Sequence, residues 1–227
     1  MSITLDQVVP WGRSLAEYQR MFDMSELDMS ANILGCGDGP ASFNAEMTAL
    51  GHPVVSCDPI YTFSKEQIAQ RVEDTYDPII EQVRRNAQNY IWNDFRNPDV
   101  LGQHRLATMR AFLADFDSGR AAGRYLPDAL PALSFRDGQF DLALCSHLLF
   151  LYSEQLSLEF HEAAIRELCR VAREVRIFPL LALDCRRSAH VAPVQERLCH
   201  AGCAAEIVRV PYEFQAGGDQ MLRVTYA

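Results

Sequence analysis

Three glycines alternate with other residues in the segment NILGCGDGPASF, as Gly35, Gly37 and Gly39. Glycine has no Cβ, so the backbone N–H groups of such a loop can approach a ligand closely, and its residues adopt positive φ without strain. The apolar pair Ile33–Leu34 comes directly before the loop and indicates a short strand. Ligands bind at the carboxyl ends of the strands in α/β sheets, so the spacing predicts a ligand-binding loop that includes Cys36.

An acidic residue, Asp58, ends the next apolar run, PVVSCDP. It lies about 20 residues beyond the glycines, which is the spacing of a carboxylate that accepts the hydroxyls of an adenosine ribose. Its neighbour Pro59 belongs to the same candidate site. A dinucleotide-binding loop has its third small residue at position 40, where this sequence has Pro40. The residues therefore favour S-adenosylmethionine, which has no diphosphate, over NAD.

His147 follows a further apolar run, FDLALCSH, and is the histidine best placed to act as a base. Methyl transfer from a sulfonium is an in-line displacement, so the protein mainly holds the nucleophile near the methyl carbon and excludes water. An oxygen or nitrogen nucleophile can also need a base. The alternative is that His147 is a packed, hydrogen-bonded side chain at a strand end. Tyr61 and Tyr152 are candidates for shaping a substrate pocket, with a place in the core as their alternative.

Strands and helices alternate along most of the chain, and this pattern predicts a doubly wound α/β sheet. The last two strands are close enough in sequence to form an antiparallel pair. Pro40 suits the first turn of a helix. The expected strands include residues 124–126, 140–145, 174–183, 205–210 and 220–227, and the expected helices are residues 14–29, 40–50, 157–173 and 193–201.

Residues 62–121 break this alternation, because they carry two long amphipathic helical patterns between two strands. Ser64 with Gln67 forms a capping box, Pro78 is expected to kink or split the first helix, and Asn97–Pro98 fits the start of the second. We expect residues 1–227 to form one domain, in which this helical insertion is a candidate substrate cap. A structural buttress or a dimer contact is the alternative.

Composition excludes several classes of function. The formal net charge is −9, which disfavours nucleic acid as a partner. The sequence has neither an export signal nor a membrane-spanning apolar run, so we expect a cytoplasmic protein without a membrane partner. The seven cysteines are read as reduced core residues. Cys199, His200 and Cys203 resemble a fragment of a zinc site, but they lie on and just after a predicted helix without a second ligand pair, so no metal is expected.

The segments ILGCGDGPASF, VVSCDP, LSFRDGQFDLALCSHLLFLY and IRELCRVAREVRIF together resemble the class I S-adenosylmethionine-dependent methyltransferases. The resemblance implies a mostly parallel seven-stranded sheet with S-adenosyl-L-methionine as cofactor. It places the glycine loop beside the methionine part of the cofactor, Asp58 on its ribose, and Cys145, Ser146 and His147 near the substrate mouth.

The sequence departs from the family pattern at three places: Ile33 replaces the usual acid, Asp128–Ala129 only loosely matches the pair after the third strand, and the Pro-Gly-Gly turn is absent. Before the first strand, Arg13 and Tyr18 are candidates for a lid that meets the cofactor's carboxylate. An apolar helix face is the alternative for Tyr18.

The leading hypothesis is methyl transfer to a small-molecule acceptor whose identity the sequence does not give. An NAD(P)-dependent oxidoreductase is the enzyme alternative. A non-catalytic module that binds S-adenosylmethionine or S-adenosylhomocysteine is the alternative from a different class. The oligomeric state stays open.

Overall fold

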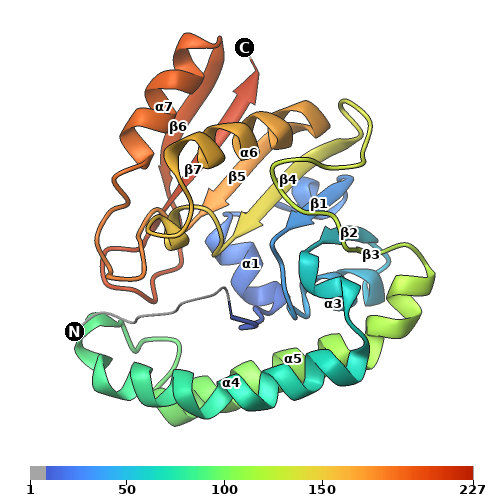
Figure 1. The fold of residues 1–227 in the computed structure, drawn as a ribbon, viewed down its shortest axis with the longest axis vertical. Helices are drawn as coiled ribbons and strands as arrows, with labels where there is room; N and C mark the ends of the chain where they lie inside the picture. Colours follow the sequence, from blue (N-terminus) through green and yellow to red (C-terminus); the bar gives the residue numbers. More distant parts are fainter. Residues whose placement is uncertain (1–8, 227) are drawn as a thin grey trace.

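The computed structural model describes residues 9–226, which form a seven-stranded sheet in the order β3-β2-β1-β4-β5-β7-β6 (Figure 1). The strands from β3 to β5 pair in parallel, whereas β7 runs antiparallel to both of its neighbours. This is the doubly wound, mostly parallel sheet that the sequence predicts, and the antiparallel pair at the end of the chain is confirmed. The strands are β1 (Ile33–Cys36), β2 (Val54–Cys57), β3 (Tyr125–Leu126), β4 (Phe140–Ser146), β5 (Ala172–Phe178), β6 (Cys203–Arg209) and β7 (Gln220–Tyr226).

The central strands are apolar along their length because both faces of the sheet are covered. All four residues of β1 are buried. The parallel register places Cys36, at the end of β1, opposite Cys57 on β2 and Cys145 on β4. The loops that follow these three strands therefore begin side by side at one edge of the sheet.

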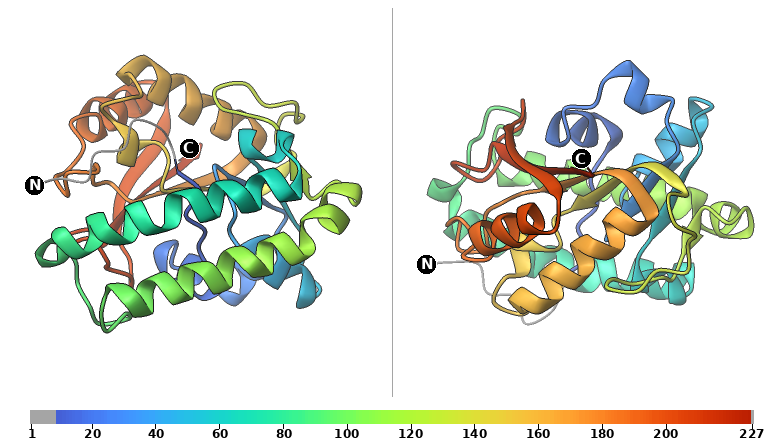
Figure 2. Two further views of the ribbon diagram at one scale, coloured as in Figure 1. Left: turned by 60° about the horizontal axis from the view of Figure 1, so that its bottom comes forward. Right: turned by 90° about the horizontal axis from the view of Figure 1, so that it is seen from above.

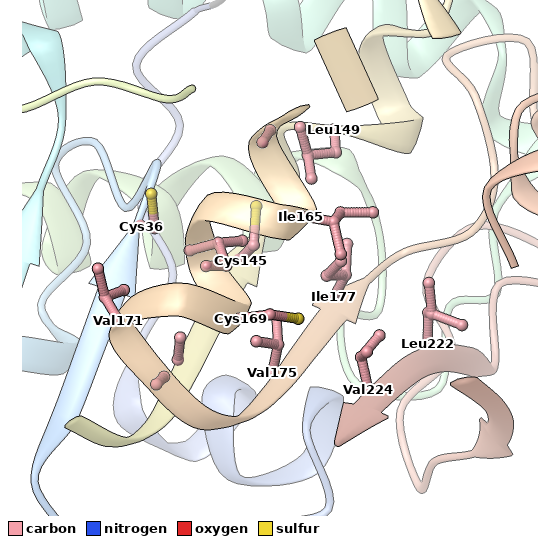
Figure 3. Close-up of a cluster of buried hydrophobic side chains, with 14 of the residues drawn as sticks. Cys36, Cys145, Leu149, Ile165, Cys169, Val171, Val175, Ile177, Leu222 and Val224 are labelled. Carbon is pink, nitrogen blue, oxygen red and sulfur yellow. The ribbon is translucent and has the colours of Figure 1, made fainter. Parts of the chain in front are cut away.

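Helices cover both faces of the sheet (Figure 2). On one face, α6 and α7 pack over a core cluster that includes Cys145, Ile165, Cys169, Val175 and Ile177 (Figure 3). On the other face, side chains of α1 and α3 pack against the opposite sides of the same strands. These helices are α1 (Leu15–Met21), α3 (Phe43–Ala49), α6 (Leu158–Val171) and α7 (Val191–His200).

Two helix predictions need correction. The helix expected over residues 14–29 is broken into α1 and the short α2 (Glu26–Met29), and between them Asp23 adopts a φ of +46°. The helix expected from Pro40 starts at Phe43, so Pro40 lies in the turn before it. In both cases a turn replaces helix where the chain must pass between packed elements.

The insertion between β2 and β3 is an antiparallel pair of long helices that runs past the carboxyl ends of β4 and β5 (Figures 1 and 2). Ser64 caps the first helix as predicted, and Asn97 accepts from the N–H of Val100 at the start of the second. Pro78 lies inside the first helix without splitting it. The elements are η1 (Pro59–Thr62), α4 (Lys65–Arg85), η2 (Ala87–Asn89) and α5 (Pro98–Ala121).

A buried ion pair joins this insertion to α1. The guanidinium of Arg105 on α5 donates two hydrogen bonds of 2.6 Å to the carboxylate of Glu17, and Arg105 is fully buried. Tyr212 donates to the same carboxylate at 2.9 Å. Nearer the sheet edge, the rings of Tyr61, Phe112, Phe116 and Tyr125 pack together. The insertion is thus held both to α1 and to the edge of the sheet.

Candidate functional site

The glycine loop after β1 needs its glycines for two physical reasons. Gly37 has a φ of +72° and Gly39 a φ of +53°, which are left-handed conformations that other residues adopt only with strain. A Cβ on Gly37 would also lie 2.7 Å from Cδ2 of Leu148, in the loop after β4. The absence of a side chain at 37 therefore lets the loops after β1 and β4 approach each other.

Asp58 contacts the glycine loop directly. Its Oδ2 accepts a 2.9 Å hydrogen bond from the N–H of Gly39, and its Oδ1 accepts one of 2.8 Å from the N–H of Ile60. Burial raises the pKa of the Asp58 carboxyl above its usual value, although both N–H groups favour the ionised form. Each carboxylate oxygen has a further lone pair with which to accept a ligand hydroxyl.

A second carboxylate, Asp38, lies buried within the loop itself. It accepts a 2.7 Å hydrogen bond from the hydroxyl of Tyr18 and one of 2.6 Å from Ser56. A Cβ on Gly35 would lie 1.9 Å from its Oδ2, so Gly35 leaves room for this carboxylate. Burial raises the pKa of Asp38 to about 6 even though both hydroxyls lower it.

A hollow with a volume of about 560 Å³, called the larger hollow below, opens at the edge where the parallel strands end. Residues that end or follow β1, β2, β3 and β4 line it together, and residues of α4 add to one side. Its lining includes Cys36, Gly37, Gly39, Asp58, Pro59, Ile60, Asp128, Ala129 and Leu148.

The smaller hollow, of about 130 Å³, shares Gly37, Gly39 and Asp58 with the larger one. It extends away from them to the end of β4 and to a group of aromatic side chains. These come from the N-terminal segment, the insertion, β5 and the chain between β6 and β7. We call the part beyond the shared residues the aromatic chamber, and it is lined by Trp11, Tyr90, Phe178, Tyr212, Phe214, Tyr152, Arg13, Ser146 and His147 among others.

His147 lies at the boundary between the glycine loop and the aromatic chamber. Its backbone has a φ of +52°, and its N–H donates to the carbonyl of Phe178 at 2.7 Å, which fixes the turn after β4. Its Nδ1 lies 2.9 Å from Oγ of Ser146. No described residue hydrogen-bonds to its Nε2. Burial and the positive charges of Arg13 and Arg105 hold the pKa of His147 well below 6.5, so the imidazole is neutral at neutral pH.

Arg13 brings a guanidinium to the wall of the aromatic chamber. One of its nitrogens donates to the carbonyl of Trp11, while its buried Nε has no hydrogen-bond partner among residues 9–226. Glu17 lies 3.9 Å away but is already engaged by Arg105. Burial and the charge of Arg105 lower the pKa of Arg13 to about 10, so it stays cationic at neutral pH.

A curated protein is similar to the chain over nearly its whole length. The uncharacterized protein MJ0045 of Methanocaldococcus jannaschii is 32% identical over 221 residues, which cover 97% of both chains. The chain belongs to the same family as MJ0045. No protein-family model matches it.

Several of the solved structures similar to the chain carry the name methyltransferase. The mitomycin 7-O-methyltransferase MmcR superposes with a TM-score of 0.51 at 12% identity, covering 94% of this chain and 54% of that one. Magnesium protoporphyrin IX methyltransferase of Synechocystis PCC 6803, crystallised with bound S-adenosylmethionine, gives a TM-score of 0.45 at 14% identity over 87% of this chain and 71% of that one. The chain has the class I methyltransferase fold that its sequence resembles.

Three of the predicted cofactor-binding residues line neither hollow. Tyr18 is fully buried, stacks on Phe43 and donates to Asp38, which fits the apolar helix face given as its alternative. Gly35 makes room for Asp38. Cys145 points into the core beneath α6 (Figure 3). Gly35 and Cys145 are strand residues, whose positions alternate between the two covered faces of the sheet, whereas Tyr18 reaches Asp38 from α1.

Tyr61 and Tyr152, the candidates for shaping a substrate pocket, have different positions. Tyr152 lines the smaller hollow, whereas Tyr61 donates to the carbonyl of Gly39 at 2.8 Å and so braces the loop.

The segment that resembles a fragment of a zinc site has Cys199 exposed and Cys203 buried. Among residues 9–226, no three histidine, cysteine or acidic side chains gather to hold a metal ion. In the same residues, no helix is long and apolar enough to cross a membrane.

Sequence reasoning missed Asp38 and the aromatic chamber. Asp38 is a buried acid whose carboxylate lies against Gly35, and its position between two glycines is a signal that could have found it. Trp11, Tyr90 and Phe214 carry no such signal, since they meet only in the folded chain.

Proposed function

We propose that the protein is an S-adenosylmethionine-dependent methyltransferase that acts on a small-molecule acceptor. The observation that carries this proposal is the direct contact of the glycine loop with Asp58 at the junction of two connected hollows. A loop with close-approaching backbone N–H groups, next to a carboxylate with spare lone pairs, fits an adenosyl ligand. The fold shared with MmcR supports the same assignment.

The residues present fit this cofactor along the larger hollow. Asp58 would accept the ribose hydroxyls, and Ile60, Ala129 and Leu148 would contact the adenine through apolar surface. The Gly37–Gly39 loop and Ser146 would lie beside the methionine part. When bound, the cofactor supplies a methyl group activated on a sulfonium.

The chain's own contribution to the reaction is positioning and proton acceptance. His147 is neutral and its Nε2 has no hydrogen-bond partner among residues 9–226, so it can accept a proton from an acceptor hydroxyl at the chamber wall. Ser146 fixes the orientation of the imidazole through Nδ1. The apolar walls exclude water from the reacting atoms.

Calorimetry and thermal denaturation with S-adenosylhomocysteine and with NAD test the cofactor assignment. At about 100 times the dissociation constant, S-adenosylhomocysteine is expected to stabilise the protein by about 2.7 kcal/mol, and NAD is expected to have no effect. Stabilisation by NAD alone would support an oxidoreductase instead. Binding of S-adenosylhomocysteine without methyl transfer to any acceptor would support a non-catalytic binding module.

A further inference from the structure

We infer that the methyl acceptor is a single-ring aromatic compound with an acidic hydroxyl, a phenol or a hydroxylated heteroaromatic ring, and that it binds in the aromatic chamber with its oxygen at His147. This inference rests on the proposed function and adds the class of acceptor. It is carried by the shape, the walls and the charges of the chamber.

The walls of the chamber are aromatic and fixed. The rings of Tyr90 and Phe214 stack at a centroid distance of 4.6 Å and an angle of 13°. Backbone hydrogen bonds join their segments, from the N–H of Ile91 to the carbonyl of Phe214 at 2.7 Å and from the N–H of Ala216 to the carbonyl of Asn89 at 3.0 Å. Rigid aromatic walls favour a flat ring, which can stack on them or meet their edges.

The size of the hollow limits what can enter. A cavity of roughly 150 Å³ lined by apolar side chains accommodates benzene. The smaller hollow has about 130 Å³, which is close to that size, and it is open on one side, so a ring can bind there with its substituents toward the opening. The acceptor group inside the chamber is therefore at most one ring in size, and fused multi-ring systems would have to project toward the opening.

The charges around the chamber favour an oxygen acid over an amine. Arg13 is a cation on its wall, and its contact with Glu17 is long, at 3.9 Å, because Arg105 already engages that carboxylate. The two carboxylates of the smaller hollow lie on its cofactor side, where Asp58 would hold the ribose and Asp38 accepts from Tyr18 and Ser56. A protonated amine would meet Arg13 without a free carboxylate, whereas an oxyanion is stabilised there.

The transfer balances with His147 as proton acceptor. The acceptor's O–H bond breaks and its proton passes to Nε2 of His147. The oxygen's electron pair forms the new O–C bond as the S–C bond breaks, and that bond's electrons stay on sulfur. The products are an aryl methyl ether and a neutral thioether, and the imidazolium returns its proton to solvent.

The test uses the full chain saturated with S-adenosylhomocysteine, with 4-nitrophenol and benzylamine as probes. Calorimetry is expected to show that 4-nitrophenol binds at least about tenfold more tightly than benzylamine. The phenolate absorbance of 4-nitrophenol is expected to rise on binding at slightly acidic pH. Comparable or tighter binding of benzylamine overturns the inference, as does the absence of 4-nitrophenol binding by protein that binds S-adenosylhomocysteine.

Variants locate the probe. Phe214→Ala and Trp11→Ala are each expected to weaken the binding of 4-nitrophenol by about tenfold or more. The affinity for S-adenosylhomocysteine should change by less than about twofold. Phe63→Ala is the matched control for 4-nitrophenol binding, which it should leave unchanged. Phe63 is an aromatic residue that lines the larger hollow and not the aromatic chamber. Unchanged 4-nitrophenol binding in both folded chamber variants overturns the inference. If the variants do not fold, the comparison of 4-nitrophenol with benzylamine on the wild-type protein decides the inference. Failure of S-adenosylhomocysteine to bind counts against the proposed function instead.

Discussion

Single residues at this site have roles that follow from backbone geometry as much as from side-chain chemistry. Gly37 and His147 both have positive φ, and they sit at the ends of two neighbouring strands, β1 and β4. Such conformations cost energy in residues other than glycine and are concentrated at functional sites. At His147 the turn is fixed by the hydrogen bond to Phe178, and His147 lies with Gly37 and Gly39 on the wall of the smaller hollow.

The first prediction concerns Asp58. We expect Asp58→Ala to weaken the binding of S-adenosylhomocysteine by about 1–3 kcal/mol in calorimetry, because charge-assisted hydrogen bonds to the ribose are lost. Asp58→Asn keeps one acceptor oxygen, so it should lose less. Equal affinity of wild type and Asp58→Ala would contradict the ribose assignment.

The second prediction separates backbone strain from collision in the glycine loop. Gly37→Ala should lower the free energy of unfolding by about 1–3 kcal/mol, because a Cβ there is strained and meets Leu148. Gly138→Ala is the control, because Gly138 has a φ of +59° and a Cβ added to it would meet no atom within 4 Å. In urea denaturation the Gly37 variant should lose more stability, and only it should lose S-adenosylhomocysteine binding. Equal losses of unfolding free energy in the two variants would show that the side chain of Leu148 moves aside at little energetic cost.

The third prediction is a pH profile. If His147 is the base, kcat/KM with a hydroxyl acceptor falls as the imidazole becomes protonated, with the acid limb below pH 6.5 because the pKa of His147 is depressed. His147→Asn suits the positive φ and should reduce kcat by roughly 10²–10⁴ and remove that limb. An acid limb that persists in this variant would assign the proton acceptor elsewhere.

At the scale of elements, the contact between α1 and α5 decides where the insertion lies. Burial acts to raise the pKa of Glu17, but the charge of Arg105 and hydrogen bonds from His104 and Arg105 lower it well below 4.5. A depressed carboxyl pKa contributes stability that is present above pH 4.5 and is lost as pH falls through the folded-state value. The ion pair therefore holds the insertion in place at neutral pH.

The fourth prediction follows from that pair. Glu17→Gln should lower the free energy of unfolding by about 3–5 kcal/mol, because Arg105 would be left as a buried charge without compensation. Glu81→Gln is the control, since Glu81 pairs with Arg84 and Arg85 on the exposed surface and should change stability by less than about 1 kcal/mol. Similar unfolding curves for both variants would show that α1 and α5 are joined mainly by apolar contacts.

At the scale of the whole molecule, the insertion and the sheet are joined through several contacts rather than by a flexible linker. The ion pair to α1 lies on one side, the Tyr61 cluster at the sheet edge, and the Tyr90–Phe214 contact at the far end. Contacts distributed in this way favour unfolding as one unit.

The fifth prediction uses the two tryptophans, Trp11 and Trp92, which both lie near the Tyr90–Phe214 contact. Tryptophan fluorescence therefore reports on the insertion, while far-ultraviolet circular dichroism reports on all helices and strands. We expect both signals to give one coincident transition in urea. A fluorescence transition at lower urea would show that the insertion unfolds separately from the sheet.

The sequence by itself determined the class of fold, and it predicted the glycine loop and the acid that the structure brings into contact. Glycine spacing, the acid at the end of the second strand and the caps at Ser64 and Asn97 are local signals, because each depends on neighbours within a few residues. Tertiary structure decided what those signals leave open. It placed Arg105 on Glu17, 88 positions away, and it brought Trp11, Tyr90 and Phe214 around one chamber. Contacts between distant segments leave no period or spacing in the sequence, since they are set by how the helices pack across the sheet edge.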